Sequence, residues 1–235
     1  MSVGPGVRLV GDGALEMSGV VANNAMNRGR GLVGVNSYAK ELGFDPGGWV
    51  VERVRAAPGV GVTWVDVCCG SGRALLEAEE RFAREIPDGE VSVIGVDLVD
   101  FFAGRPRSSR LRLVTASAVG WEPPGAADLV TCVHGLHYLG DKLGVIAAMA
   151  GWVAPGGLFV ADFDVAEIRA ADGTSAGARV TAALRAAGLT YDRRKRRVRG
   201  VGPRRPEFGA TYLGADDAAG PGYTGQPSVR SYYDW

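Results

Sequence analysis

The sequence has few of the residues that crosslink small proteins or hold metal ions. It contains 3 cysteines and 2 histidines among 235 residues. An odd set of cysteines, two of them adjacent at Cys68 and Cys69, argues against a disulfide framework and fits free thiols in a reducing compartment. Neither histidine is accompanied by a Cys-x-x-Cys pair, so no metal-ligand spacing is present. We therefore expect a cytoplasmic protein without a bound metal.

Excess charge and long apolar runs are also lacking. The 26 basic and 26 acidic side chains give a formal net charge of +0, which argues against attraction of the whole protein to nucleic acid or to an anionic membrane. No apolar run is long enough to cross a bilayer, and the first residues lack the apolar core of a secretory signal. Nucleic acid and membrane are therefore not expected as partners, and a homodimer is left open.

The most informative stretch that is present runs from Trp64 to Gly72, with the sequence W-V-D-V-C-C-G-S-G. An apolar strand carrying one acid, Asp66, breaks into a glycine turn, and an amphipathic run follows at once. Glycine has no Cβ, so the backbone of such a turn can pass close to a ligand. Strand, glycine turn and helix together predict a nucleotide-sized pocket.

A second acid supports this pocket. The apolar, β-branched residues 91–96 end in Asp97, and a carboxylate at the end of the second strand of a βαβ unit is placed to accept the ribose hydroxyls of an adenosine. Dinucleotide oxidoreductases and S-adenosylmethionine methyltransferases share this arrangement. The dinucleotide fingerprint G-x-G-x-x-G is broken here, because Leu75 stands where the third glycine belongs, which argues against a pyrophosphate site.

Four segments, in the expected order, resemble class I S-adenosylmethionine-dependent methyltransferases. They are D-V-C-C-G-S-G (66–72), I-G-V-D-L (94–98), A-A-D-L-V-T-C-V-H-G-L-H-Y-L (126–139) and V-A-P-G-G-L-F-V-A-D-F (153–163). Two positions depart from the family pattern. Cys68 replaces the usual first glycine, and Ser117 stands where many members have a third acid near the adenine.

Apolar patterning predicts the order of helices and strands. We expect strands near 62–67, 91–97, 111–115, 128–133 and 157–163, and helices near 37–42, 46–54, 73–86, 100–104, 142–153 and 174–187. Such alternation predicts a parallel sheet covered on both sides. With the resemblance, the fold class is α/β: a Rossmann-like seven-stranded sheet, mostly parallel with an antiparallel C-terminal strand, with helices on both faces.

The expected organisation has four parts: a flexible N-terminal arm (1–24), a helical lid (25–58), the S-adenosylmethionine-binding domain (59–213) and a C-terminal loop packed on that domain (214–235). We interpret the basic run 193–199 as a solvated strand at the sheet edge. The alternative is that it recognises an anionic substrate. Residues 208–213 are expected to form the last strand, paired with this basic run.

The resemblance implies roles for particular residues around the cofactor. Asp66 orders the motif or reaches the cofactor's ammonium, Asp97 accepts the ribose hydroxyls and Leu98 lies against the adenine. The full set expected at the cofactor is Tyr38, Asp66, Cys68, Gly70, Gly72, Asp97, Leu98, Ser117, Ala118, Val133 and His134.

On the acceptor side, His134 and His137 are candidate general bases, each with a purely structural role as the alternative. Tyr138 and Asp162 are candidate substrate-binding residues; Asp162 could hold a cationic amine, and the alternative is that it only begins a loop.

The expected function is methyl transfer from S-adenosyl-L-methionine to a small-molecule acceptor, with S-adenosyl-L-homocysteine as product. The acceptor is expected to be a specialised, natural-product metabolite, methylated on oxygen, nitrogen or carbon. In-line transfer needs mainly a positioned nucleophile and exclusion of water. Two alternatives remain open: an enzyme that uses the same cofactor for another reaction such as cyclisation, and a protein that binds the cofactor without turnover.

Overall fold

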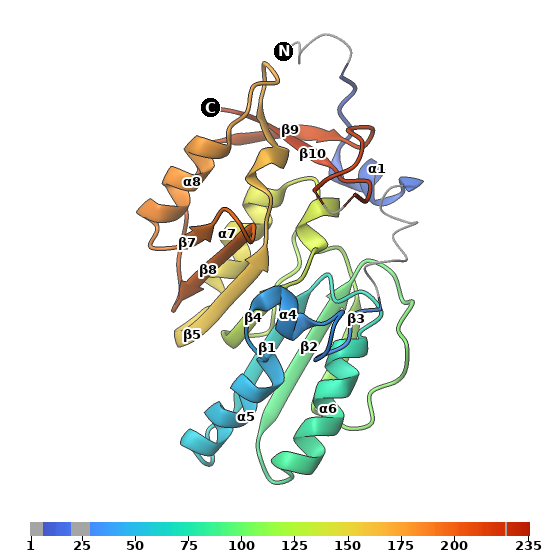
Figure 1. The fold of residues 1–235 in the computed structure, drawn as a ribbon, viewed down its shortest axis with the longest axis vertical. Coiled ribbons are helices and arrows are strands. Elements are labelled where there is room, and N and C mark those ends of the chain that lie inside the picture. Colours follow the sequence, from blue (N-terminus) through green and yellow to red (C-terminus); the bar gives the residue numbers. More distant parts are fainter. Residues whose placement is uncertain (1–6, 20–28, 224) are drawn as a thin grey trace.

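The computed structural model describes residues 7–19, 29–223 and 225–235. The larger of its two sheets has seven strands in the order β3-β2-β1-β4-β5-β8-β7 (Figure 1). Five of these strands run parallel to one another. They are β1 (Val62–Val67), β2 (Val91–Asp97), β3 (Leu111–Thr115), β4 (Ala127–Cys132) and β5 (Val153–Asp162). Strand β8 (Arg197–Val201) pairs antiparallel with β5 and with β7 (Thr190–Asp192). The expected fold class is confirmed.

Helices cover both faces of this sheet. One face packs against α4 (Tyr38–Leu42), α5 (Pro46–Ala56) and α6 (Arg73–Glu85) through a core that includes Val50 and Phe82. The other face packs against α7 (Lys142–Gly151) and α8 (Gly177–Ala186) through a second core that includes Ile146 and Leu184. Strands covered on both sides are mostly apolar and buried, and β1 and β4 are each buried at every position but one.

Strand β1 leads into α6 through the glycine turn. Gly72 precedes the helix with φ of +68°, and a Cβ added there would lie 3.0 Å from a side-chain methyl of Leu113. Left-handed backbone and tight packing therefore both favour glycine at this position. Gly72 serves the turn and the packing against β3, and it is not among the residues that line the pocket described below.

A second, smaller sheet joins the two ends of the described chain. Its order is β6-β10-β9, formed by β6 (Ile168–Ala170), β9 (Thr211–Asp216) and β10 (Arg230–Asp234). The short helix α1 (Asp12–Glu16) docks on it through Leu15, which is 1% exposed and packs with Ala215 and Val229. Figure 1 shows α1, β9 and β10 together at one end of the molecule.

Several expectations about local structure are corrected. Residues 98–104 contain no helix, and the strand expected at 208–213 forms as β9 in the second sheet. The segment 214–235, expected as a loop, contains β10. Of the arm expected at 1–24, residues 12–16 form α1, while 1–6 and 20–24 lie outside the described residues, as do 25–28 of the expected lid.

The basic run does not form the edge of the sheet. Its last residues belong to β8, which lies between β5 and the edge strand β7. Arg197 donates a hydrogen bond to the backbone oxygen of Glu41, and Arg196 forms a 3.1 Å ion pair with Asp164. Two of its guanidinium groups are therefore engaged with neighbouring elements rather than simply solvated.

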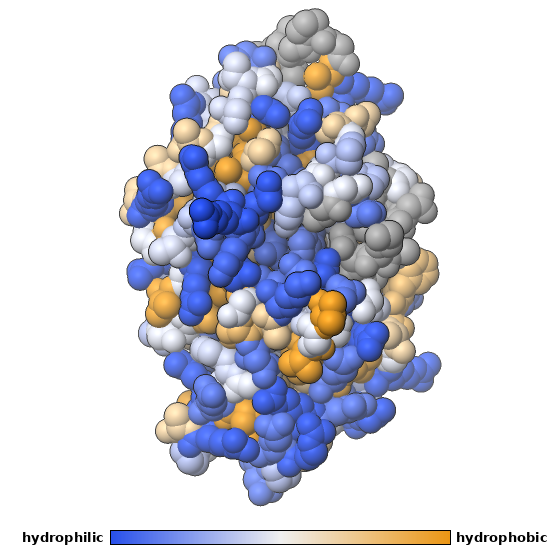
Figure 2. Space-filling view, viewed as in Figure 1, coloured by the Kyte–Doolittle hydropathy of each residue, from blue (hydrophilic) through white to orange (hydrophobic). Residues whose placement is uncertain are grey.

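Apolar side chains on the surface are scattered. On the face drawn in Figure 2 they occur in small separate groups among hydrophilic residues. Within the described part of the chain, no helix combines the length and the apolar character that crossing a membrane requires.

Candidate active site

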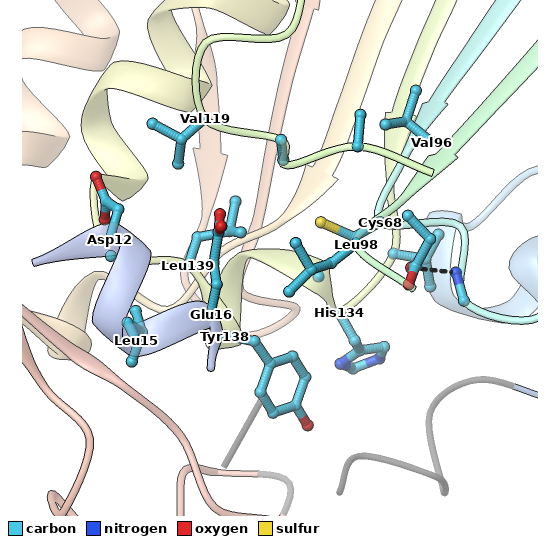
Figure 3. A pocket seen from close by; sticks show the side chains of 17 residues that line it. Asp12, Leu15, Glu16, Cys68, Val96, Leu98, Val119, His134, Tyr138 and Leu139 are labelled. Carbon is cyan, nitrogen blue, oxygen red and sulfur yellow. Dashed lines mark hydrogen bonds between the residues drawn. The ribbon is translucent and has the colours of Figure 1, made fainter. Parts of the chain in front are cut away.

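One pocket opens at the carboxyl ends of β1, β2 and β4, where parallel sheets of this type bind ligands. Its walls come from the loops after these strands, from the 3-10 helix η1 (Gly135–Tyr138) and from α1 (Figure 3). The lining residues are Asp12, Leu15, Glu16, Cys68, Gly70, Val96, Asp97, Leu98, Ala116, Ala118, Val119, Val133, His134, Gly135, Tyr138, Leu139 and Gly140.

Asp97 is fixed at the edge of this pocket by the backbone. Its Oδ2 accepts a 2.8 Å hydrogen bond from the amide of Gly70, and its Oδ1 accepts a 3.4 Å hydrogen bond from the amide of Val99. Gly70 has φ of +61°, which glycine adopts without strain. A carboxylate held in this way next to a glycine turn is preorganised to accept hydrogen bonds from a diol.

Two non-glycine residues adopt left-handed backbone where β1 and β4 end. Cys68 has φ of +59° and His134 has φ of +57°. Such strain in non-glycine residues is concentrated at functional sites. Hydrogen bonding with the Cys132 thiol, together with burial, raises the pKa of Cys68 well above its usual range. Cys68 therefore contributes a neutral thiol to the pocket wall.

Gly135 allows these two strand ends to approach each other. A Cβ at this position would overlap the Cβ of Cys68 and lie 2.8 Å from its Sγ. We expect Gly135→Ala to lower the free energy of unfolding by about 1–3 kcal/mol through overpacking, measured by chemical denaturation. The double variant Gly135→Ala with Cys68→Gly removes the obstructing side chain and should recover part of the loss. Equal stability of wild type and Gly135→Ala would contradict this packing.

Asp66 supports the pocket from behind and does not line it. Its carboxylate is fully buried and accepts hydrogen bonds from the Tyr38 hydroxyl (2.7 Å) and from the Thr131 hydroxyl. The indole of Trp64 donates to the same threonine oxygen at 2.8 Å. Burial raises the pKa of Asp66 to about 7, against the opposing effect of the two hydroxyl donors. Tyr38 and Asp66 thus tie α4 to β1.

This buried carboxyl predicts a pH dependence of stability. Because the pKa of Asp66 is higher in the folded chain, the group stabilises the fold at low pH, and that stabilisation is lost as the pH rises toward about 7. Asp66→Asn does not titrate, so its stability relative to wild type should rise between about pH 5 and about pH 8. Urea unfolding of both proteins across that range measures the difference, and a constant difference would contradict the prediction.

His134 lies between two carboxylates at the inner end of the pocket. Its side chain is nearly buried, and its Nε2 is 3.1 Å from Oε2 of Glu41 and 3.8 Å from Oδ2 of Asp162. Its Nδ1 is 3.4 Å from the hydroxyl of Tyr223. A hydrogen bond with His134 lowers the pKa of Glu41, whereas burial raises the pKa of Asp162 to about 6. Helix α4, the end of β5 and the C-terminal segment therefore converge on one imidazole.

The three ligand atoms of this cluster lie within 4.8 Å of one another, a spacing that a metal ion could also use. Positive charge is already present around them. Arg30 pairs with Glu41 at 3.0 Å, and Arg197 donates to the backbone oxygen of the same residue. Because these two guanidinium groups already offset the negative charge of Glu41, the cluster is better described as an imidazole held between two carboxylates than as a metal site.

His137 is buried behind the pocket rather than in its wall. Its Nδ1 is 2.9 Å from Oε1 of Glu167. The Lys142 ammonium lies 3.7 Å from the other oxygen of Glu167 and donates to the backbone oxygen of Val229 at 2.7 Å. Burial lowers the pKa of Lys142 to about 8. These contacts anchor the C-terminal segment, so the geometry favours a positioning role for His137.

The structure brings together some of the residues expected from the sequence and leaves others outside. The pocket wall contains Cys68, Gly70, Asp97, Leu98, Ala118, Val133, His134 and Tyr138. Outside it lie Tyr38, Asp66, Gly72, Ser117, His137 and Asp162; of these, Asp162 reaches the site through His134, and Ser117 through a hydrogen bond to Glu16.

Sequence reasoning missed Asp12, Leu15 and Glu16 of α1, and also Glu41 and Tyr223. A five-residue helix in a glycine-rich segment has too little periodicity to be recognised. Tyr223 belongs to the segment 214–235 expected to pack on the domain, but the sequence does not indicate which residue it contacts.

A pocket bounded by a glycine turn and a fixed carboxylate, at the carboxyl ends of a mostly parallel sheet, defines a Rossmann-like nucleotide-binding domain. A family model described as a methyltransferase domain matches residues 43–191, which is more than half of the chain. The protein belongs to this methyltransferase family.

Curated relatives match part of the chain. It is 31% identical over 94 residues to a trans-aconitate 2-methyltransferase of Methylobacterium radiotolerans, covering 40% of this chain and 35% of the relative. It is 32% identical over 117 residues to a ubiquinone biosynthesis O-methyltransferase of Pseudomonas paraeruginosa, covering 46% of each. The chain spans half or less of the length of these relatives.

Solved structures give similar partial matches. An amino pentose methyltransferase from Micromonospora echinaspora with bound S-adenosylmethionine is 29% identical, with a TM-score of 0.36 over 50% of this chain and 49% of that one. A methyltransferase from Thiobacillus denitrificans in complex with S-adenosyl-L-homocysteine is 22% identical, with a TM-score of 0.35 over 48% and 47%. S-adenosyl-L-methionine is the cofactor that family membership assigns to this chain, and the fixed carboxylate of Asp97 and the apolar walls of the pocket fit its adenosine.

Proposed function

We propose that the protein transfers the methyl group of S-adenosyl-L-methionine to a hydroxyl group of a small-molecule acceptor and releases S-adenosyl-L-homocysteine. The observation that carries this proposal is the position of His134. It lines the pocket that suits the cofactor and is also the centre of the Glu41, Asp162 and Tyr223 cluster. Cofactor and acceptor sites therefore meet at one imidazole.

The cofactor supplies an activated methyl group, and the protein's main task is to align the acceptor with it and exclude water. We propose that Gly70 and Asp97 hold the cofactor and that Val133 and His134 face its sulfonium. Tyr138 lines the acceptor side, and Tyr223 closes it near His134.

A hydroxyl acceptor must lose its proton as the new bond forms. With the imidazole proton on Nε2, that nitrogen faces the Glu41 carboxylate at 3.1 Å, and Nδ1, 3.4 Å from the Tyr223 hydroxyl, is left as the proton acceptor. Glu41 and Asp162 then stabilise the imidazolium that results, because both carboxylates lie on its Nε2 side. We assign His134 as the general base and Glu41, Asp162 and His137 as positioning residues.

Oxygen is favoured as the methylated atom because an imidazole base is useful for a hydroxyl and unnecessary for an unprotonated amine. The O-methyltransferase named among the relatives supports the same choice. A specialised metabolite is our proposed acceptor class. A cationic amine held by Asp162 is the second candidate, because Oδ2 of that carboxylate is buried and has no hydrogen-bond partner among the described residues.

Incubation of the purified protein with S-adenosyl-L-methionine and a panel of phenols, hydroxy acids and amines tests the proposal. Mass spectrometry should find S-adenosyl-L-homocysteine and a methylated hydroxy compound in equal amounts. An acceptor that is converted without formation of S-adenosyl-L-homocysteine would instead support a reaction such as cyclisation. Cofactor binding with no conversion of any acceptor would favour a protein that binds without turnover.

A further inference from the structure

Helix α1 brings a carboxylate into the cofactor pocket from a distant part of the sequence. Leu15 anchors the helix in the small core with Ala215 and Val229. Its last residue, Glu16, lines the pocket, and Figure 3 shows it projecting into the space bordered by Leu98, Val119 and Leu139. The pocket wall on this side is therefore completed by a segment outside the region matched by the family model.

Ser117 holds this carboxylate in place. Its hydroxyl donates a hydrogen bond to Oε1 of Glu16 and accepts one from the amide of Val119 at 3.0 Å. The backbone of the loop after β3 thereby fixes the hydroxyl, and the hydroxyl fixes the acid. A carboxylate has about four acceptor positions, so the bond from Ser117 leaves Glu16 able to accept from a ligand.

The three acids of the pocket wall have different partners. Asp97 is bound by the Gly70 amide at one end of the pocket. Asp12 is engaged by the hydroxyl of Tyr212 at 3.1 Å and by the amide of Asp141 at 3.3 Å. Glu16 accepts from the hydroxyl of Ser117, which lies outside the pocket wall and directly precedes the lining residue Ala118. Glu16 is thus the acid best placed to meet a second polar group of the ligand.

An adenosine presents hydrogen-bond donors at two ends, the ribose diol and the exocyclic amino group of the purine, with a flat apolar ring between them. The pocket wall carries the carboxylates of Asp97 and Glu16 together with the apolar side chains of Leu98, Ala118, Val119 and Leu139. We propose that Glu16 accepts a hydrogen bond from the exocyclic amino group of the cofactor's adenine, and that Ser117 is its positioning residue. This inference rests on the proposed cofactor site and makes α1 part of it.

The proposal predicts discrimination between 6-amino and 6-oxo purines. The control ligand is S-inosyl-L-homocysteine, which carries an acceptor oxygen in place of the donor amine at C6 and a donor N–H in place of the acceptor nitrogen at N1. Wild type should bind the adenosyl compound about tenfold or more tightly, because the oxo group would face a carboxylate. Glu16→Ala should lose most of this preference, and Glu16→Gln, whose amide can donate as well as accept, should also lose it. Ser117→Ala should reduce it less.

Calorimetric titration of each variant with both ligands measures the ratio of dissociation constants, and circular dichroism confirms folding. The matched control is Glu52→Ala on the exposed side of α5, which should keep the wild-type ratio. A folded Glu16→Ala protein that keeps the wild-type preference would overturn this inference while leaving the cofactor site intact. Failure of wild type to bind S-adenosyl-L-homocysteine at all would instead overturn the proposed function.

Discussion

Replacement of Asp97 by alanine is expected to weaken binding of S-adenosyl-L-homocysteine by about 100-fold or more. The substitution removes the acceptor of two hydrogen bonds from the ribose diol, each worth about 1.5–3 kcal/mol when the acceptor is charged. It also removes the group that holds the Gly70 amide at 2.8 Å, so the glycine turn loses part of its preorganisation. Isothermal titration calorimetry measures the change directly.

Asp97→Asn provides the matched control. Its side-chain oxygen can still accept from Gly70, but it lacks the charge and carries donors that oppose a diol. Its affinity should lie between those of wild type and Asp97→Ala. A dissociation constant for Asp97→Ala equal to that of wild type, in a protein that is folded by circular dichroism, would contradict the assignment of this carboxylate to the ribose.

Replacement of His134 by alanine is expected to slow turnover of a hydroxyl acceptor by about 10²–10⁴-fold, the usual contribution of a positioned base. Binding of S-adenosyl-L-homocysteine should change little, because the imidazole acts on the acceptor. His134→Asn serves as the backbone control, since asparagine tolerates left-handed φ and the native residue has φ of +57°.

A series of acceptors with different acidities separates a base role for His134 from a packing role. If the imidazole removes a proton, the loss in His134→Ala should shrink as the acceptor hydroxyl becomes more acidic, because such acceptors ionise without help. Glu41→Gln should show the same trend with a smaller loss, since it removes the carboxylate 3.1 Å from Nε2. Rates measured over a series of substituted phenols give this dependence. A uniform loss across the series would contradict the base assignment.

The main sheet could be predicted from the sequence because its signals are local. Strand β2 is a run of apolar, β-branched residues ending in an acid, and α6 has apolar residues at helical spacing directly after Gly70 and Gly72. The carboxyl ends of parallel strands meet at one edge of a sheet, so strand order alone placed Asp97 and His134 around one pocket.

The remaining parts depend on contacts between distant segments. Glu41 reaches His134 only because α4 packs over the strand ends, and Glu16 reaches Ser117 across 101 positions of the sequence. Strands β6, β9 and β10 are short, and β6 pairs with β10 from a distant part of the sequence. No local pattern carries this information. The basic run was misplaced for a related reason: partners such as Glu41 and Asp164 are visible only in the folded chain.

Titration of the wild-type protein with S-adenosyl-L-homocysteine tests the central claim most directly. The arrangement of Asp97, the glycine turn and the apolar wall predicts saturable binding with one ligand per chain, competed by S-adenosyl-L-methionine and not by NADH. A folded sample that takes up neither adenosyl compound would contradict the account.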